Sequence, residues 1–490
     1  MNHPNIVMVM ADDMGFWSMG CAGNREIRTP NLDRLAQEGM FFPDYFCTSP
    51  VCSPARASVL CGKMPSRHGV HDWISKGHVD YEDVAPSLRE KHQEAGAGWE
   101  YEWSRMQLAS DKAIRYMEGL RTYTDILAEH GYVCGLAGKW HLGDAVHPQN
   151  GFSYWEPIAM GGDNYYYPVV LQEGHFDMLR ETYITNYITG KALDFLRQQN
   201  GERPFYLSVH YTAPHAPWER NHHPEEFYSL YQDCPFAETP NVPPHRWGSP
   251  YSQEDRRQRL QGYYAAVTAM DSDIGKLIDY LKGENLWEDT IFIFTADNGM
   301  SMGHHGIFGK GNGTFPLNLY DTAVKVPMII AYPKRIQGGS VARGLYSHYD
   351  LFPTIAGLMG EEPDPDCPGH SFQEILQGRI PDGRDAVVVY DEYGPARMIR
   401  TMEYKYIHRY PYGENEFYDL TADPGEEVNL AETEDPGVQE KIAFLKNQME
   451  QWFIRYSDPD RDGTRQDVYG LGQIGRVGKE GGGKRAFIRR

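Results

Sequence analysis

Cys52 is the residue of this chain whose surroundings point most directly to chemistry. It opens the run Cys52-Ser53-Pro54-Ala55-Arg56, in which Pro54 suits the first turn of a helix. Cys52 would then lie at the start of that helix, where free backbone N–H groups favour an anion. An isolated cysteine at such a place is more often a buried structural residue. With Arg56 one turn further along, and with the polar residues described next, we favour a reactive residue that handles an anion.

Two polar pairs follow apolar runs at separate places in the chain. Asp12 and Asp13 come after one run, and Asp297 and Asn298 come after another. Carboxylate and amide oxygens suit Ca²⁺ or Mg²⁺ better than a metal that prefers thiolates. Acidic residues after strands also serve as helix caps and turn formers. One pair would leave both interpretations open, whereas two pairs at separate strand ends favour a metal site.

Five further residues could contact a ligand or transfer a proton: Lys139, His141, His215, His305 and Lys310. A lysine is usually a solvated surface charge. However, Lys139 follows a glycine and Lys310 lies between two glycines, which favours tight turns near a ligand. His215 lies between two prolines, and His305 lies in a Gly-His-His-Gly run. Single histidines are more often structural, and these two remain candidates for acid–base or substrate contacts.

Short apolar runs predict the buried strands that must position these residues. The runs cover residues 6–10, 132–136, 205–209, 290–294 and 326–330. Helical patterns lie between them, for example at Pro30–Glu38 and Leu260–Leu281. Strands that alternate with helices predict an α/β fold with a largely parallel sheet covered on both faces. Ligands bind beyond the carboxyl ends of the strands in such sheets, so we expect four of these strand ends to share one site.

The composition changes near residue 380, and we expect a large domain over residues 1–383 and an α+β domain over 384–469. Short strands are predicted at 386–390, 397–401, 404–408 and 416–420, and a helix at about 438–456. Residues 470–490 form a glycine-rich tail with six Lys or Arg residues and one Glu. Such a tail is usually disordered. We expect this one to dock on an acidic surface, for which a neighbouring subunit of a homo-oligomer is one candidate.

Length and composition narrow the class of protein. The 490 residues are 41% hydrophobic and 23% charged, so the chain can bury a large core. Its formal net charge of −21 argues against nucleic-acid and anionic-membrane partners, because both reward a basic surface. No apolar run is long enough to predict a membrane span. The seven cysteines indicate no disulfide framework.

The N-terminal residues show no signal-peptide pattern, because an apolar strand begins near Asn5 and a polar turn follows at Asp12. We therefore expect a cytoplasmic protein, or a periplasmic or secreted one if a leader segment precedes Met1.

Taken together, these motifs resemble the formylglycine-dependent (type I) sulfatase family of the alkaline phosphatase superfamily. The resemblance covers nearly the whole chain, and its motifs occur in the family's order. It rests on Thr29–Gly39, Cys52–Arg56 with Leu60–Gly62, Gly131–Gly143, Ala213–His215, Thr295–Gly299, Val326-Pro327 and Phe417–Leu420. It implies an alkaline phosphatase-like sheet between helices, followed by a smaller α+β C-terminal domain with a short antiparallel sheet.

The resemblance also implies the cofactors. A Ca²⁺ or Mg²⁺ ion would be held by Asp12, Asp13, Asp297, Asn298 and position 52. A maturase, as a protein partner, would oxidise Cys52 to formylglycine, whose hydrate carries two hydroxyl groups. One hydroxyl attacks the sulfur of the substrate, and the other loses its proton and expels sulfate.

Five other positions receive roles from the same resemblance. Arg56 would support the hydrate and offset charge. Lys139 and Lys310 would bind the sulfate oxygens as charge builds up. His215 would protonate the leaving alcohol, and His141 would be the base of the elimination step.

We expect the substrate to be a small or chain-end sulfated molecule, most simply a sulfated sugar, with an aryl or steroid sulfate as the nearest alternative. The long segment 74–121 would shape the pocket together with Trp73, Asn164, Tyr166, Trp218 and His305, although aromatic residues near a polar site are as often packing as sugar contacts. A phosphonate monoester or phosphodiester hydrolase is a second interpretation. A non-catalytic anion-binding protein with an unconverted Cys52 is a third.

Overall fold

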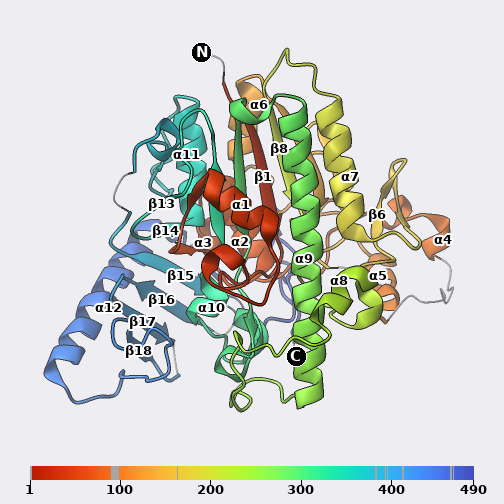
Figure 1. Cartoon of the computed structure of the whole chain (residues 1–490). Helices are drawn as coiled ribbons and strands as arrows, with labels where there is room; N and C mark the ends of the chain where they lie inside the picture. The colour runs from red at the N-terminus through yellow and green to blue at the C-terminus, as the bar shows by residue number, and fades with distance from the viewer. Residues whose placement is uncertain are drawn as a thin grey trace.

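The structure is a computed structural model, and it describes residues 3–89, 99–162, 164–380, 383–391, 393, 395–410, 413–463, 466 and 468–489. Within these residues the chain forms a 10-stranded central sheet and a 4-stranded sheet near the C-terminus (Figure 1). This is the predicted fold class, with a mostly parallel sheet, covering helices and a small antiparallel sheet.

The centre of the large sheet is parallel. Its neighbouring strands are β9 (Thr290–Ala296), β1 (Asn5–Ala11), β8 (Phe205–His210), β4 (Val133–Lys139) and β5 (Tyr154–Ile158). Beyond β9 lie β12 (Met328–Ala331), β2 (Met40–Phe41) and β13 (Ser340–Val341), and beyond β5 lie β6 (Val169–Gln172) and β7 (His175–Met178). Strand β12 runs antiparallel to β9.

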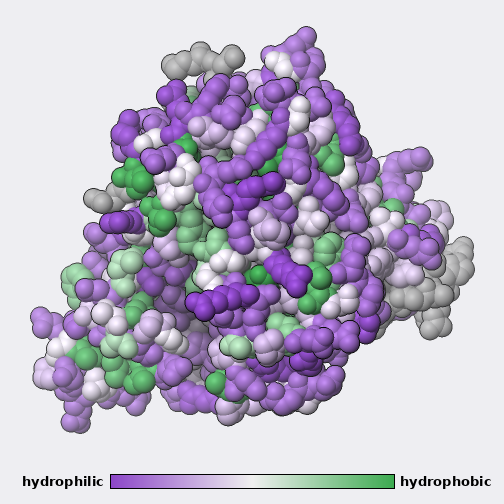
Figure 2. All heavy atoms as spheres, in the orientation of Figure 1, coloured by the Kyte–Doolittle hydropathy of each residue, from purple (hydrophilic) through white to green (hydrophobic). Residues whose placement is uncertain are grey.

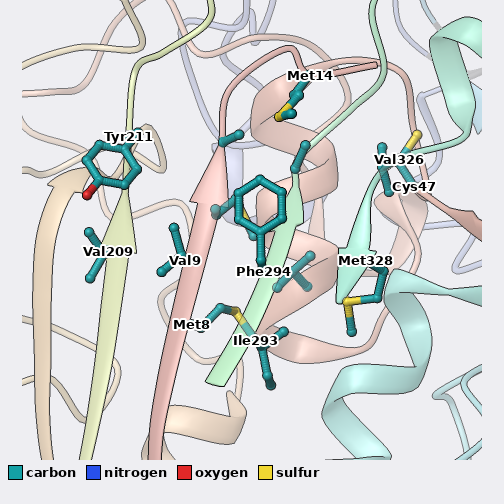
Figure 3. Packing of buried hydrophobic residues seen from close by; sticks show 14 of the residues in the cluster. Met8, Val9, Met14, Cys47, Val209, Tyr211, Ile293, Phe294, Val326 and Met328 are labelled. Atoms are coloured by element: carbon teal, nitrogen blue, oxygen red, sulfur yellow. The ribbon is translucent and has the colours of Figure 1, made fainter. Parts of the chain in front are cut away.

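Strand β1 lies between two parallel partners and is buried on both faces. Val9 pairs with Val209 of β8 and with Phe294 of β9, and all three side chains have 0% exposure. Figure 3 shows their packing together with Met8 and Ile293. A strand without a solvent face needs apolar residues at every position, which explains the unbroken run at 6–10.

Two groups of helices cover this sheet. The first contains α1 (Pro30–Glu38), α7 (Ile184–Arg197) and α9 (Gln253–Gly283), and the second contains α2 (Cys52–Cys61), α6 (Tyr123–Glu129) and α11 (Leu351–Leu358). Strand β4 shows that α6 and α7 lie on opposite faces. Cys134 points toward Thr124 of α6 (Sγ–O 3.8 Å), while Gly135 lies against the ring of Phe195 of α7. Successive residues of a strand face opposite sides, so the sheet is sandwiched.

Shorter elements complete the large domain. They are α3 (Pro65–His68), α4 (Pro86–Arg89), α5 (Trp99–Leu108), α8 (Glu225–Tyr228) and α10 (Asp321–Val324), with the strand pairs β3 (Tyr45–Phe46) and β14 (Tyr346–Ser347), and β10 (Ser301–Met302) and β11 (Phe308–Gly309).

The C-terminal sheet is antiparallel throughout. Its strands are β15 (Val387–Asp391), β16 (Ala396–Arg400), β17 (Tyr404–Arg409) and β18 (Glu416–Asp419), close to the predicted ranges. Helix α12 (Pro436–Tyr456) packs on it through the buried residues Leu445, Met449 and Phe453. Tyr390 of β15 meets the Phe453 ring edge-on with centroids 5.0 Å apart. This sheet and helix share an apolar cluster that also includes Met64 and Tyr349 of the large domain.

The C-terminal tail returns to the large domain of its own chain. Gln473 forms single bridges to Ile74 and to Phe487, and Gln473 and Phe487 are almost fully buried. Acidic partners are present at the rim, where Arg476 lies 2.8 Å from Glu118. The predicted docking on an acidic surface is therefore only part of the contact, because most of it is backbone pairing and apolar burial. A role in a homo-oligomer stays a prediction.

The face of the molecule seen in Figure 2 is mostly hydrophilic, with small separate hydrophobic patches. Among the described residues, no helix combines the length and the apolar character needed to cross a membrane.

Candidate active site

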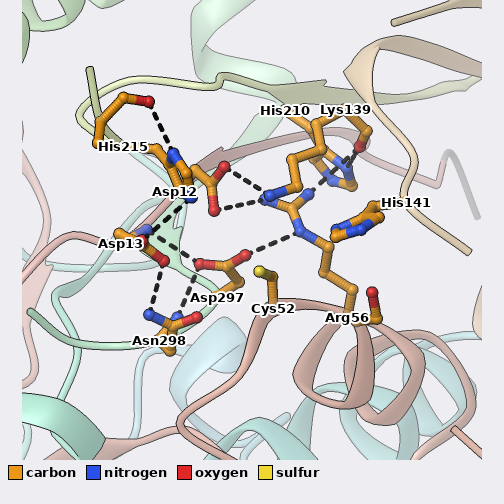
Figure 4. A network of polar contacts seen from close by, with 12 residues as sticks. Asp12, Asp13, Cys52, Arg56, Lys139, His141, His210, His215, Asp297 and Asn298 are labelled. Atoms are coloured by element: carbon orange, nitrogen blue, oxygen red, sulfur yellow. Dashed lines mark hydrogen bonds and ion pairs between the residues drawn. The ribbon is translucent and has the colours of Figure 1, made fainter. Parts of the chain in front are cut away.

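The carboxyl ends of the parallel strands meet at one site, as predicted from their polar endings. Asp12 and Asp13 follow β1, Asp297 and Asn298 follow β9, and Lys139 is the last residue of β4. Backbone hydrogen bonds fix the turns, because the Asp297 N–H donates to the Ala11 carbonyl at 3.1 Å. Figure 4 shows these side chains pointing toward one another above Cys52. The sheet therefore brings together residues almost 300 positions apart in the chain.

The acidic residues form a compact, buried group of oxygen donors. Ligand atoms of Asp12, Cys52 and Asp297 all lie within 4.8 Å of one another. Asn298 Nδ2 donates to Asp13 Oδ1 at 2.9 Å, so the amide oxygen of Asn298 points away from that carboxylate oxygen. That oxygen and Asp12 Oδ1 are buried and have no hydrogen-bond partner among the described residues. Buried oxygens without a donor are what a hard cation requires, so this donor set fits Ca²⁺ or Mg²⁺.

Three cations surround the acids. Lys139 Nζ lies 2.6 Å from Asp12 Oδ2, Lys310 Nζ lies 2.6 Å from Asp13 Oδ1, and Arg56 Nε lies 2.8 Å from Asp297 Oδ2. Burial raises the pKa of Asp12 to about 6, against the opposing effect of Lys139. Burial acts the same way on Asp297, but Arg56 and the two lysines outweigh it and hold the pKa of that carboxyl below its usual range. The site is therefore rich in charge of both signs, as an anion-processing centre requires.

Cys52 begins helix α2, as its sequence predicts. Its side chain is 4% exposed, and its Sγ accepts a hydrogen bond from Lys310 Nζ at 3.0 Å. Burial raises the pKa of the thiol, although Lys139 and Lys310 oppose that effect. Arg56 Nη1 donates to the Lys139 carbonyl at 3.2 Å and so ties the end of β4 to α2. Position 52 thus lies beside both the acids and an ammonium group.

His141 is arranged as a neutral base. Its Nε2 lies 3.0 Å from the Ile74 carbonyl, which can only accept, so the ring proton is on Nε2. Nδ1 is then the basic nitrogen, and it has no hydrogen-bond partner among the described residues. Burial, reinforced by Lys139, holds the pKa of His141 well below 6.5. The backbone of His141 is left-handed (φ 55°), an uncommon conformation that the fold maintains here.

His215 lies on the opposite side of the acids. Its Nε2 lies 3.5 Å from Asp13 Oδ2, and its Nδ1 donates to the Ala216 carbonyl at 2.8 Å. Its side chain is 29% exposed. His215 can therefore reach a ligand while it keeps contact with an acidic partner.

A pocket of about 720 Å³ opens over this group. It is lined by Cys52, His141, His215 and Lys310, and by two of the predicted substrate contacts, Trp73 and Trp218. A volume of this size holds a small molecule or the end of a larger one.

The three other predicted substrate contacts do not line this pocket. Asn164 is 1% exposed and accepts the Tyr166 N–H at 2.9 Å, so it shapes a turn. The Tyr166 ring packs beside Tyr183 with centroids 5.4 Å apart. His305 stacks on Tyr320 at 3.7 Å and lines a different hollow. Of the predicted segment 74–121, Ile74 lines the pocket, and residues 90–98 lie outside the described residues.

The sequence reasoning missed several residues of the site. His210 ends β8 and contacts the Lys139 carbonyl through Nδ1 at 3.0 Å. It follows an apolar run just as Asp12 does, so the same rule could have found it. Asp255 and Arg259 line the pocket from α9, and nothing in their local pattern indicated this.

Comparison with known proteins identifies relatives of this arrangement. A family model described as Sulfatase matches residues 4–361, and one described as N-sulphoglucosamine sulphohydrolase, C-terminal, matches residues 303–454. An N-acetylglucosamine-6-O-sulfatase of Bacteroides thetaiotaomicron is 27% identical, with 94% of this chain and 88% of that protein covered. The human N-acetylgalactosamine-6-sulfatase is 28% identical over 77% of this chain and 67% of its own length.

Solved structures agree at the level of the fold. One of them, a complex with its substrate D-glucosamine-2-N,6-O-disulfate, has a TM-score of 0.74 and 24% sequence identity, and covers 94% of this chain and 99% of that chain.

Proposed function

The chain belongs to the sulfatase family, and we propose that it hydrolyses the sulfate monoester of a small or chain-end sulfated sugar. One observation carries the proposal. Cys52 begins a buried helix at the floor of the pocket, with Lys310 Nζ 3.0 Å from its Sγ and the acids of β1 and β9 beside it. The residue proposed as nucleophile, an ammonium group and the acids therefore lie next to one another at the pocket.

A sugar is favoured by the relatives and by the pocket walls. The similar proteins named above act on 6-sulfated N-acetylhexosamines, by their names. In this chain, Trp73 and Trp218 line the pocket, and flat aromatic faces suit the apolar face of a sugar ring. The charged side chains of Asp255 and Arg259 also reach the pocket and could bind its hydroxyl groups.

We propose that Asp12, Asp13, Asp297 and Asn298 hold a Ca²⁺ or Mg²⁺ ion. Such an ion supplies Lewis-acid stabilisation of negative charge on the sulfate group. Position 52, once a maturase has oxidised it, supplies an aldehyde hydrate with one hydroxyl group for attack on sulfur and a second for release of the product.

The protein's own cations and histidines carry the remaining roles. Lys139 and Lys310 bind the sulfate oxygens, and Arg56 holds Asp297 in place from α2. His215, which is 29% exposed and lines the pocket, donates a proton to the leaving sugar oxygen. His141 accepts a proton at Nδ1, because its Nε2 is already bound to the Ile74 carbonyl. The two histidines thus serve opposite proton transfers from opposite sides of the pocket.

The test combines chemistry at Cys52 with substrate choice. The protein is co-expressed with a maturase, and the mass of the tryptic peptide that contains Cys52 is measured by mass spectrometry. Conversion of thiol to aldehyde lowers its mass by about 18 Da. The converted protein is then assayed on 6-sulfated N-acetylglucosamine and N-acetylgalactosamine, an aryl sulfate, a phosphodiester and a phosphonate monoester. The variant C52A is the control.

Conversion together with fastest turnover of a sulfated sugar supports the proposal. Faster turnover of the phosphodiester or phosphonate would contradict it in favour of the phosphonate hydrolase interpretation. An unconverted thiol that binds sulfated sugars without turnover would support the anion-binding alternative.

A further inference from the structure

Residues 71–75 form the wall of the pocket nearest to His141, and Trp73 and Ile74 line that pocket. The Ile74 carbonyl accepts from His141 Nε2 at 3.0 Å, and the Ile74 N–H donates to Ser53 Oγ at 3.1 Å. The backbone of Ile74 therefore touches both the proposed base and the residue next to Cys52. Its position decides which nitrogen of His141 carries the proton.

The side chain of Gln473, from the C-terminal tail, holds the start of this wall from behind. It is 0% exposed, although glutamine is usually a surface residue. Its Oε1 accepts the His71 N–H at 2.9 Å, and its Nε2 donates to the carbonyls of Gly69 at 2.8 Å and Gly475 at 3.0 Å. Its side chain thus pairs buried backbone groups of two distant segments that would otherwise be unsatisfied.

The backbone of Gln473 holds the rest of the wall. Its N–H donates to the Trp73 carbonyl at 2.8 Å, and its own carbonyl accepts the Ser75 N–H at 2.9 Å. Ile74 lies between these two bonds and pairs with Gln473 as an isolated bridge. Displacing Gln473 would therefore release the residues on both sides of Ile74.

Gly472 makes this close approach possible. Its φ is +112°, and a Cβ there would lie 2.5 Å from Ser75 Cβ, so only glycine fits. Its N–H donates to Asp72 Oδ2 at 3.1 Å. The tail folds back on itself, because the Ile474 N–H donates to the Ala486 carbonyl at 2.7 Å. Phe487 is 2% exposed, and its burial anchors the tail.

We propose that residues 470–489 are a structural strap of the active site and that Gln473 is a positioning residue for His141 and Trp73. The effect on catalysis rests on the proposed sulfatase function, while the contact itself does not. Gln473 does not line the pocket, so it acts on the site through its contacts with residues 69–75. When the strap loosens, His141 Nε2 loses a fixed acceptor, the tautomer with a basic Nδ1 is no longer enforced, and the Trp73 wall moves.

The main variant is Q473M, which keeps the volume and removes the three side-chain hydrogen bonds. Partners that orient an active residue typically contribute about 10- to 100-fold to activity, and we expect kcat on the sulfated sugar to fall by about that factor. G472A is an independent second variant, because its clash with Ser75 displaces the same contact. Both should speed amide hydrogen exchange in the peptide that contains residues 71–75.

Two matched controls isolate the effect. R476A removes the ion pairs of Arg476 with Glu118 and with Glu480 at the outer rim of the tail, and should leave kcat within twofold. Lys405 lies in the C-terminal domain, and its fully buried ammonium pairs with Asp321. K405M removes this ammonium and should lower the free energy of unfolding without lowering the kcat of the folded enzyme.

Faster exchange at 71–75 together with loss of kcat in both main variants supports the proposal. Unchanged exchange overturns it, and so does faster exchange with unchanged kcat. If the wild-type enzyme turns over no sulfate ester, the proposed function fails instead, and the exchange result alone then decides whether the tail holds the wall.

Discussion

Removing the ammonium of Lys310 is the sharpest test of how the site stabilises charge. This side chain is 8% exposed, and its Nζ lies 2.6 Å from Asp13 Oδ1 and 3.0 Å from Cys52 Sγ. The attacking atom of the converted residue would occupy the region of Sγ, so the sulfate oxygens would lie within about 4 Å of this ammonium. A unit charge pair at that distance contributes about 4 kcal/mol at an effective dielectric constant of about 20.

Only the part of this interaction that grows toward the transition state lowers the barrier. Loss of one donor from an anion-stabilising site typically costs about 2.7–4 kcal/mol. We therefore expect K310A to lower kcat/KM on the sulfated sugar by about 10²- to 10³-fold. The assay is initial-rate kinetics. Mass spectrometry must first show that Cys52 is converted to the same extent in both proteins, because Lys310 also contacts that residue.

K405M is the matched control for this variant as well. Lys405 Nζ is fully buried and lies 2.7 Å from Asp321 Oδ1, and it also pairs with Glu426. Breaking a buried ion pair costs about 3–5 kcal/mol of folding free energy in either variant, but only Lys310 faces the pocket. If K310A keeps kcat/KM within threefold of the wild type, or if K405M loses as much as K310A, the assigned role of Lys310 is wrong.

Four other changes test the proposed acid, the buried Asp72 and the metal site. H215A should lower turnover of a sulfated sugar by about 10²- to 10⁴-fold but barely affect an aryl sulfate with an acidic leaving group, and equal losses on both would exclude the acid role. Burial raises the pKa of Asp72 from 3.8 to about 7, so the fold loses stability as pH rises from about 4 to 7. D72N has no carboxyl group to titrate and should not show this loss. In urea titrations, the unfolding free energy of D72N minus that of the wild type should therefore rise by up to about 4 kcal/mol between about pH 4 and 7. A difference that stays constant over this range would contradict the raised pKa of Asp72. Treatment with a chelator should lower both the activity and the melting temperature. Adding Ca²⁺ or Mg²⁺ should raise the melting temperature of N298L by less than that of the wild type. An equal rise in both proteins would exclude Asn298 as a metal ligand.

The strands and their polar endings could be predicted because both signals are local. A strand buried on two faces must be apolar throughout, so the first polar residue after it marks the end of the sheet. This rule located Asp12 and Asp297, and a parallel sheet then places both at one edge. The small antiparallel sheet and helix α12 were predictable for the same reason.

Contacts made by backbone atoms could not be predicted. The carbonyl of Ile74 fixes the proton of His141, yet any residue type has a carbonyl, so the sequence carries no sign of it. Gln473 acts at residues about 400 positions away, and its polarity alone resembles that of a surface residue. Asn164 shapes a turn and His305 stacks on the Tyr320 ring, and neither lines the pocket. Their contact with a substrate stays a prediction.

The position of the tail in the sequence means that its contacts with residues 71–75 form late in synthesis. During synthesis, Gln473 leaves the ribosome about 420 residues after Cys52, which is about 20 to 80 s at ordinary translation rates. Throughout that interval the hydrogen bonds that Gln473 makes with residues 71–75 cannot form. If Cys52 is oxidised by a maturase as proposed above, that enzyme would have this period to act before residues 470–489 pack beside the wall.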